Sequence, residues 1–123
     1  MTEQVPERKT GIARILKAYA YTQAGIIQTL KTEAAFRQEA ALAVVLVPLA
    51  LYFGPGGLAK AVMVGSVLAV LVIELLNSAI ESVVNRFGPE WNIYSKHAKD
   101  AGSAAVFFAL CNMAVTWVLC LFF

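Results

Sequence analysis

Three apolar segments dominate this chain, and each is long enough to cross a lipid bilayer as a helix. They run from about 34 to 53, 58 to 84 and 101 to 123. A helix of about 20 residues spans the hydrocarbon core. Of the 123 residues, 59% are hydrophobic and 15% are charged, whereas about a quarter of the residues in soluble domains are charged. The sequence therefore predicts a single all-α membrane domain with three transmembrane helices.

A different kind of helix is expected before the first span. Between about 12 and 31, apolar residues recur at three- and four-residue spacing, and Arg14, Lys17 and Tyr21 occupy the opposite arc. This pattern predicts an amphipathic helix that lies in the membrane interface. The preceding stretch, 1–11, is a polar tail without the apolar core of a secretory signal peptide.

The distribution of Lys and Arg predicts the orientation of the chain. Nine of the 10 basic residues lie either before the first span, up to Arg37, or in the connection from 85 to 99, and Lys60 alone lies on the other side. With three spans these two regions share one side of the membrane, and the positive-inside rule places that side in the cytoplasm. The N-terminus is expected in the cytoplasm and the C-terminus outside. With a net charge of only +2, no nucleic-acid partner is expected.

Two carboxylates, Glu74 and Glu81, lie inside the second apolar segment. An ionised side chain at membrane depth costs about 2.5–3.5 kcal/mol on insertion scales, so such residues mark functional sites that face protein or water. Asn77 lies between them on the same helix face, because residues three, four and seven positions apart share a face. Both acids fall toward the cytoplasmic end of the segment, which indicates chemistry near that membrane surface.

Further polar groups begin the first and third spans and are expected at the same membrane face. They are Glu33, Arg37, Gln38, Glu39, Lys96, Lys99, Asp100 and Ser103. Carboxylates without a Cys or His cluster suit Mg²⁺, cationic side chains neutralise phosphate oxygens, and a further carboxylate can deprotonate a hydroxyl. Together these groups match the needs of phosphoryl transfer, although the chain lacks the glycine-rich loops of the large kinase classes. Taken singly, Glu33 and Arg37 also fit a surface ion pair, and Lys96, Lys99 and Asp100 fit a solvated connection.

Three stretches of the sequence resemble the prokaryotic diacylglycerol kinase family, whose members are small integral-membrane lipid kinases. They read EAAFRQE over 33–39, ELLNSAIE over 74–81 and AKDAGSAA over 98–105. The resemblance extends over nearly the whole chain from about Gly11. It implies a homotrimer with composite sites in the bacterial inner membrane, which transfers the γ-phosphate of MgATP to diacylglycerol and yields phosphatidic acid.

The resemblance also implies roles for individual residues. Glu74 corresponds to the general base, Asn77 orders the catalytic centre, and Glu33 and Glu81 hold the divalent cation. The implied nucleotide contacts are Arg14, Tyr21, Glu33, Glu81, Glu90, Trp91, Asn92, Lys99 and Asp100. The implied lipid contacts are Arg14, Ala35, Phe36, Arg37, Gln38, Glu39, Glu74 and Ser103. The chain departs from the family pattern at Asn85, where an acid is common, and at Asn92, where the connection often reads E-x-H.

Three other functions compete with this interpretation. A kinase of the same fold that acts on undecaprenol is the nearest, and the sequence separates the two alcohols poorly. A small proton-coupled multidrug transporter would need four spans and a glutamate near the middle of the first. A purely structural membrane subunit would not need acids at membrane depth.

Overall fold

The structure, a computed structural model, describes residues 10–123. Within this range the chain forms the helices α1 (Gly11–Thr32), α2 (Ala34–Phe53), α3 (Gly56–Arg86) and α4 (Ile93–Phe122), and no strand. The polar tail predicted over 1–11 lies outside the described residues except for Thr10 and Gly11. The predicted all-α architecture is confirmed.

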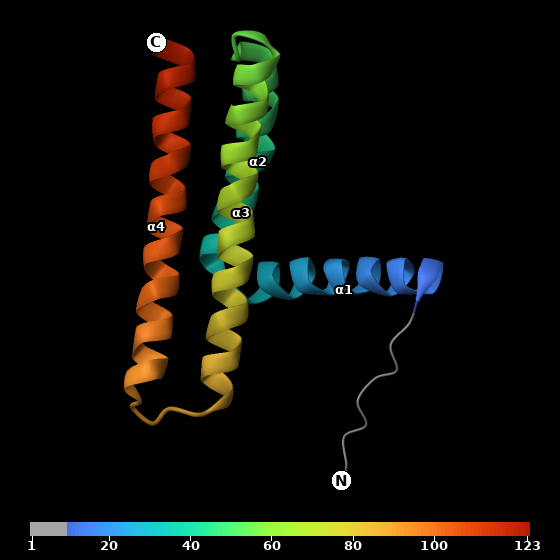
Figure 1. Cartoon of the computed structure of the whole chain (residues 1–123), viewed down its shortest axis with the longest axis vertical. Coiled ribbons are helices and arrows are strands. Elements are labelled where there is room, and N and C mark those ends of the chain that lie inside the picture. Colours follow the sequence, from blue (N-terminus) through green and yellow to red (C-terminus); the bar gives the residue numbers. More distant parts are fainter. Residues whose placement is uncertain (1–9) are drawn as a thin grey trace.

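Helices α2, α3 and α4 run side by side, and α3 packs against both of the others (Figure 1). All three are long and apolar enough to cross a membrane. Helix α1 runs across their axes and projects away from them (Figure 1). Large apolar side chains on α1, among them Ile12 and Ile15, are exposed, which fits a helix that lies on lipid in the interface.

Arg37 stabilises the bend at Glu33, the elbow between the surface helix α1 and the first membrane-spanning helix α2. Glu33 is extended between α1 and α2, and the Arg37 guanidinium donates from Nη1 to the carbonyl oxygens of Leu30 (2.8 Å) and Lys31 (3.2 Å). These are among the last carbonyls of α1, which have no partner within the helix. Arg37 therefore caps α1, and no ion pair joins it to Glu33.

The last helix begins eight residues earlier than the predicted span, at Ile93 instead of 101. Asn92 caps it, because its Oδ1 accepts hydrogen bonds from the backbone N–H groups of Tyr94 (2.9 Å) and Ser95 (3.2 Å). The connection is thus short, from Phe87 to Asn92, and turns at Gly88, whose φ of 94° favours glycine. The predicted apolar span does not include this first part of the helix, because many of its side chains are polar. Helix α3 likewise extends two residues beyond each end of the predicted 58–84.

A polar contact also joins α3 and α4 inside the bundle. The fully buried Met63 offers its carbonyl oxygen to Ser66 Oγ (2.7 Å) and to Trp117 Nε1 of α4 (3.3 Å). Hydrogen bonds between helices in a membrane contribute about 0.6 kcal/mol on average and up to about 1.7. This contact therefore stabilises the pairing of the two helices modestly.

Replacing Trp117 by phenylalanine is expected to lower the free energy of unfolding by about 1 kcal/mol, because the hydrogen bond and part of the ring packing are lost. Thermal unfolding in detergent measures this loss as a lower midpoint. Tyr52→Phe is the matched control, since Tyr52 is 81% exposed and its hydroxyl has no partner within the described residues. Equal midpoints for Trp117→Phe and the wild type would contradict this assignment.

Candidate active site at the membrane interface

Glu74 lies on α3 with only 5% of its surface exposed, so it faces protein rather than lipid. The Glu39 carboxyl group on α2 is close enough to interact electrostatically with it. Glu39 Oε2 is buried and has no hydrogen-bond partner of its own. The packing of α2 against α3 thus brings two carboxyl groups together at membrane depth. The family resemblance implied a lipid contact for Glu39, and the sequence gave no sign of this pair.

Asn77 lies one turn from Glu81 on α3 and is directed toward it. Its Nδ2 donates to Glu81 Oε1 over 3.5 Å, a long and therefore weak hydrogen bond. Asn77 Oδ1 is buried without a hydrogen-bond partner and lies against Gly102 of α4. Glu81 itself is only partly buried. It therefore contacts the Asn77 amide weakly and keeps part of its surface accessible.

The polar start of α4 carries a second group of candidate residues. Lys96 Nζ and Asp100 Oδ2 form an ion pair of 2.6 Å, with both side chains more than 60% exposed. Lys99 is exposed one turn further on, and Ser103 Oγ donates to its carbonyl oxygen over 3.1 Å. Such an exposed ion pair adds little stability, about 0–1 kcal/mol, and leaves Lys99 as a free cation at this end of α4 within the described part of the chain.

A pocket of about 620 Å³ opens where α3 and α4 are joined. Glu90, Trp91, Asn92 and Lys99 line it, and all four were implied as nucleotide contacts. Its volume lies in the range of small-molecule sites. Trp91 is 76% exposed and offers an aromatic surface, whereas Asn92 Oδ1 already caps α4. An adenine contact through that oxygen would therefore compete with the cap.

Replacing Asn92 by alanine is expected to destabilise the start of α4 by about 1 kcal/mol, the usual cost of losing such a cap. Hydrogen exchange at Tyr94 and Ser95 should become faster. Asn92→Asp is the matched control, because aspartate caps equally well and exchange should stay slow. If the aspartate variant exchanged as fast as the alanine variant, the cap would not be the function of this side chain.

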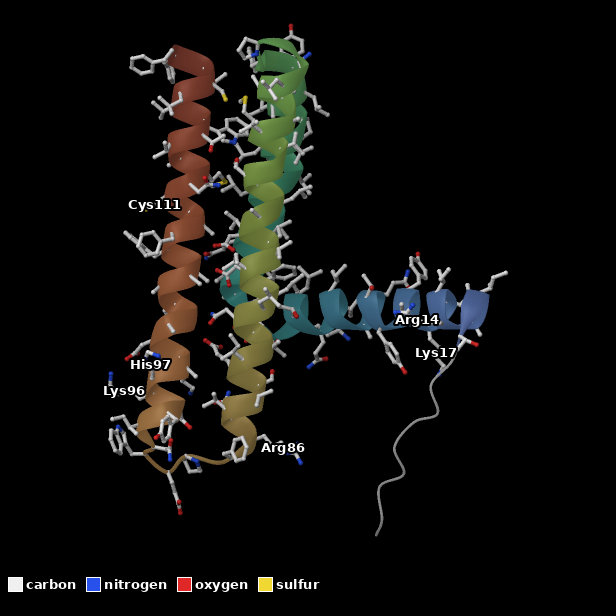
Figure 2. The ribbon with its side chains drawn as sticks, viewed as in Figure 1. Arg14, Lys17, Arg86, Lys96, His97 and Cys111 are labelled. Carbon is white, nitrogen blue, oxygen red and sulfur yellow. The ribbon has the colours of Figure 1, made fainter. Side chains whose placement is uncertain are left out.

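Other implied site residues are not brought together within one chain. Figure 2 places Arg14 far along α1, remote from Lys96 at the start of α4. Tyr21, on the same helix, lies under Lys17, whose Nζ is 6.0 Å from the ring centre. Phe36 is buried, with 3% exposed, so it is a core residue in this chain, while Ala35 and Gln38 are exposed. The candidate residues therefore fall into separate groups on α1, on the α2–α3 interface and at the start of α4.

The acidic residues suit a magnesium–nucleotide complex better than a metal site built from protein alone. Among the described residues, no three His, Cys, Asp or Glu side chains lie close enough together to hold a metal ion. Glu33 at the elbow and Glu81 on α3 are both partly exposed and offer hard oxygen ligands. Mg²⁺ commonly takes one or two carboxylates and completes its shell with phosphates and water. The donor set therefore fits Mg²⁺ that arrives with a nucleotide.

Comparison with known proteins identifies the family of this chain. The model of the family "Prokaryotic diacylglycerol kinase" matches residues 20–121. The diacylglycerol kinase of Haemophilus influenzae is 42% identical over 94% of this chain and 98% of its own length. The enzymes of the same name from Pseudomonas aeruginosa (47%, covering 89% of each chain) and Escherichia coli K12 (40%, covering 91% and 92%) are similarly related. The chain therefore belongs to the prokaryotic diacylglycerol kinase family.

Proposed function

We propose that this chain transfers the γ-phosphate of MgATP to the primary hydroxyl of diacylglycerol and so produces phosphatidic acid and ADP. The observation that carries the proposal is the buried carboxylate of Glu74 on a membrane-spanning helix, with the partly exposed Glu81 two turns nearer to water. Relatives named diacylglycerol kinase, 40–47% identical over most of their length, support the same activity.

The positions of the two acids suit a reaction between a lipid and a soluble nucleotide. Seven residues separate Glu74 from Glu81, about 10 Å along the helix axis. The ends of α3 and α4, marked by Arg86 and Lys96, extend past the level of α1 (Figure 2). If α1 lies in the interface, the pocket beside these ends is in water and Glu74 lies near the lipid head groups. The two substrates would then meet along one face of α3.

In the proposed reaction Glu74 accepts the proton of the lipid hydroxyl as its oxygen bonds to the γ-phosphorus. The bond from this phosphorus to the β,γ-bridging oxygen breaks, and ADP leaves with the electron pair. Asn77 steadies Glu81, and Lys99 and Arg14 would neutralise phosphate oxygens. Asp100, held by Lys96, would border the nucleotide. Mg²⁺, held by Glu33 and Glu81, would supply charge neutralisation on the phosphates when bound.

We further propose that complete sites form between subunits of a homotrimer in the bacterial inner membrane, with the N-terminus in the cytoplasm. Arg14 is remote from the start of α4, which Lys96 marks (Figure 2). This separation supports sharing, because Arg14 on α1 and Lys99 on α4 are both assigned to nucleotide contacts. The lipid head would lie along Ala35, Phe36, Gln38 and Ser103. Phe36 is buried in the single chain, so a lipid contact there needs a small movement of α2.

One experiment tests the substrate assignment. The purified chain in bilayers receives ATP labelled at the γ-phosphate together with either diacylglycerol or undecaprenol. Label should enter phosphatidic acid at a rate well above that of undecaprenyl phosphate. Preferential labelling of undecaprenol would show that undecaprenol, and not diacylglycerol, is the substrate. No labelling of either lipid would overturn the proposed kinase activity.

A further inference from the structure

Gly102 on α4 and Asn77 on α3 are in unusually close contact. Gly102 is buried, and a Cβ atom added there would overlap Asn77 Oδ1 and lie only 3.3 Å from Asn77 Cγ. The overlap involves a short side chain that is itself confined between two helices, so it cannot be relieved by bending a long flexible chain. The Asn77 amide therefore fits in this position only because Gly102 has no side chain.

Gly102 and Glu81 together explain which way the amide points. Because Asn77 Oδ1 occupies the place of the missing Cβ, it faces a hydrogen on the Gly102 Cα, and it has no other partner. A Cα–H group can donate a weak hydrogen bond to such an oxygen at a helix–helix interface. In the reversed orientation Oδ1 would face the Glu81 carboxylate, and two acceptors would repel each other. The observed orientation directs Nδ2 to Glu81 instead.

We propose that Gly102 is a positioning residue for the nucleotide–metal site and acts on Glu81 through Asn77. This inference rests on the proposed function, in which Glu81 holds the divalent cation. The chain of contacts runs from the Gly102 backbone to Asn77 Oδ1 and from Asn77 Nδ2 to Glu81 Oε1. With one oxygen of Glu81 directed toward the amide, the carboxylate is biased toward one orientation at the cation.

A methyl group at position 102 should break this chain of contacts without changing any charge. The Asn77 amide would have to rotate away from α4, and Glu81 would lose its donor. A merely structural function for Gly102, close approach of two helices, makes a different prediction. In that case the substitution would lower stability regardless of the residue at 77 and would not specifically weaken cation binding.

The test measures Mn²⁺ binding by electron paramagnetic resonance, with the full chain in bilayers and a non-hydrolysable ATP analogue present. We expect Gly102→Ala to weaken Mn²⁺ binding at least about tenfold, in the range found when an outer hydrogen-bond partner of a metal ligand is removed. Gly65→Ala on α3 is the matched control, because a Cβ there meets no atom within 4 Å, and its Mn²⁺ binding should equal that of the wild type. Wild-type binding by Gly102→Ala would overturn the proposal.

A double substitution separates the two functions of Gly102. Asn77→Ser should weaken Mn²⁺ binding by itself, and Gly102→Ala should then add less than a twofold effect, because the shorter serine avoids the overlap. An equal loss in both backgrounds would show that Gly102 acts through helix packing and not through Asn77. If Gly102→Ala alone does not fold, Asn77→Ser should restore folding, and failure to do so would contradict the inference. Failure of the proposed function is seen separately, as wild-type Mn²⁺ binding by Glu81→Gln.

Discussion

Replacing Glu74 by glutamine is expected to lower kcat for phosphatidic acid formation by about two to four orders of magnitude, the usual contribution of a general base. Glutamine has nearly the same shape as glutamate but cannot accept the proton of the lipid hydroxyl. The substitution also removes one of two neighbouring carboxyl groups without changing the side-chain volume, so the packing of α2 against α3 should persist. The initial rate of label transfer from γ-labelled ATP to diacylglycerol in bilayers measures the effect.

The binding properties of the same variant provide the control. Mn²⁺ and ATP-analogue affinities should stay within about twofold of the wild type, because Glu74 lies about 10 Å along α3 from Glu81. The thermal midpoint should also change little. Unchanged turnover in Glu74→Gln, with nucleotide and cation still bound, would exclude Glu74 as the base.

Replacing Glu81 by glutamine is expected to have the second large effect, on the Mg²⁺ requirement. The substitution removes one of the two carboxylates assigned to the cation and leaves a neutral amide, a weaker ligand for this hard ion. We expect the Mg²⁺ concentration for half-maximal rate to rise by about 100-fold or more, since loss of a mere outer partner costs about 10–100-fold. A magnesium titration of the initial rate at saturating ATP and diacylglycerol measures this shift.

Ser82→Ala is the matched control for this titration. Ser82 is the next residue on α3 and is exposed, and it has no place in the proposed site. Its magnesium titration should overlay that of the wild type. If Glu81→Gln also gave the wild-type titration, the cation would be held by other groups and the assignment of Glu81 would be wrong.

The membrane spans were predictable because a lipid environment imposes a simple requirement on sequence. Each crossing segment must be apolar over about 20 residues, and the limits of the first predicted span agree with α2. The start of α4 was not predictable in this way. Helix α4 begins at Ile93, in a part that carries Lys96 and Asp100, and a helix that leaves the membrane no longer needs apolar residues. Its signal was local, the cap residue Asn92 before Tyr94.

The candidate site was predictable where its members share one helix. Glu74, Asn77 and Glu81 follow each other at helical spacing, so their common face follows from the sequence. Contacts between residues on different helices could not be predicted, because they depend on the axial position of one helix relative to the other. Neither the approach of Glu39 to Glu74 nor the seating of Asn77 against Gly102 can be read from spacing. The capping function of Arg37 was hidden for a similar reason, since an ion pair with Glu33 fits the same spacing.

The central claim is that the acids of α3 serve magnesium-dependent phosphoryl transfer to a lipid at the membrane surface. The most direct measurement adds γ-labelled ATP to the purified wild-type chain in diacylglycerol-containing bilayers, with Mg²⁺ or with a chelator. We expect labelled phosphatidic acid with Mg²⁺ and none with the chelator. Undiminished labelling in the absence of divalent cations, or no labelling with Mg²⁺ present, would contradict it.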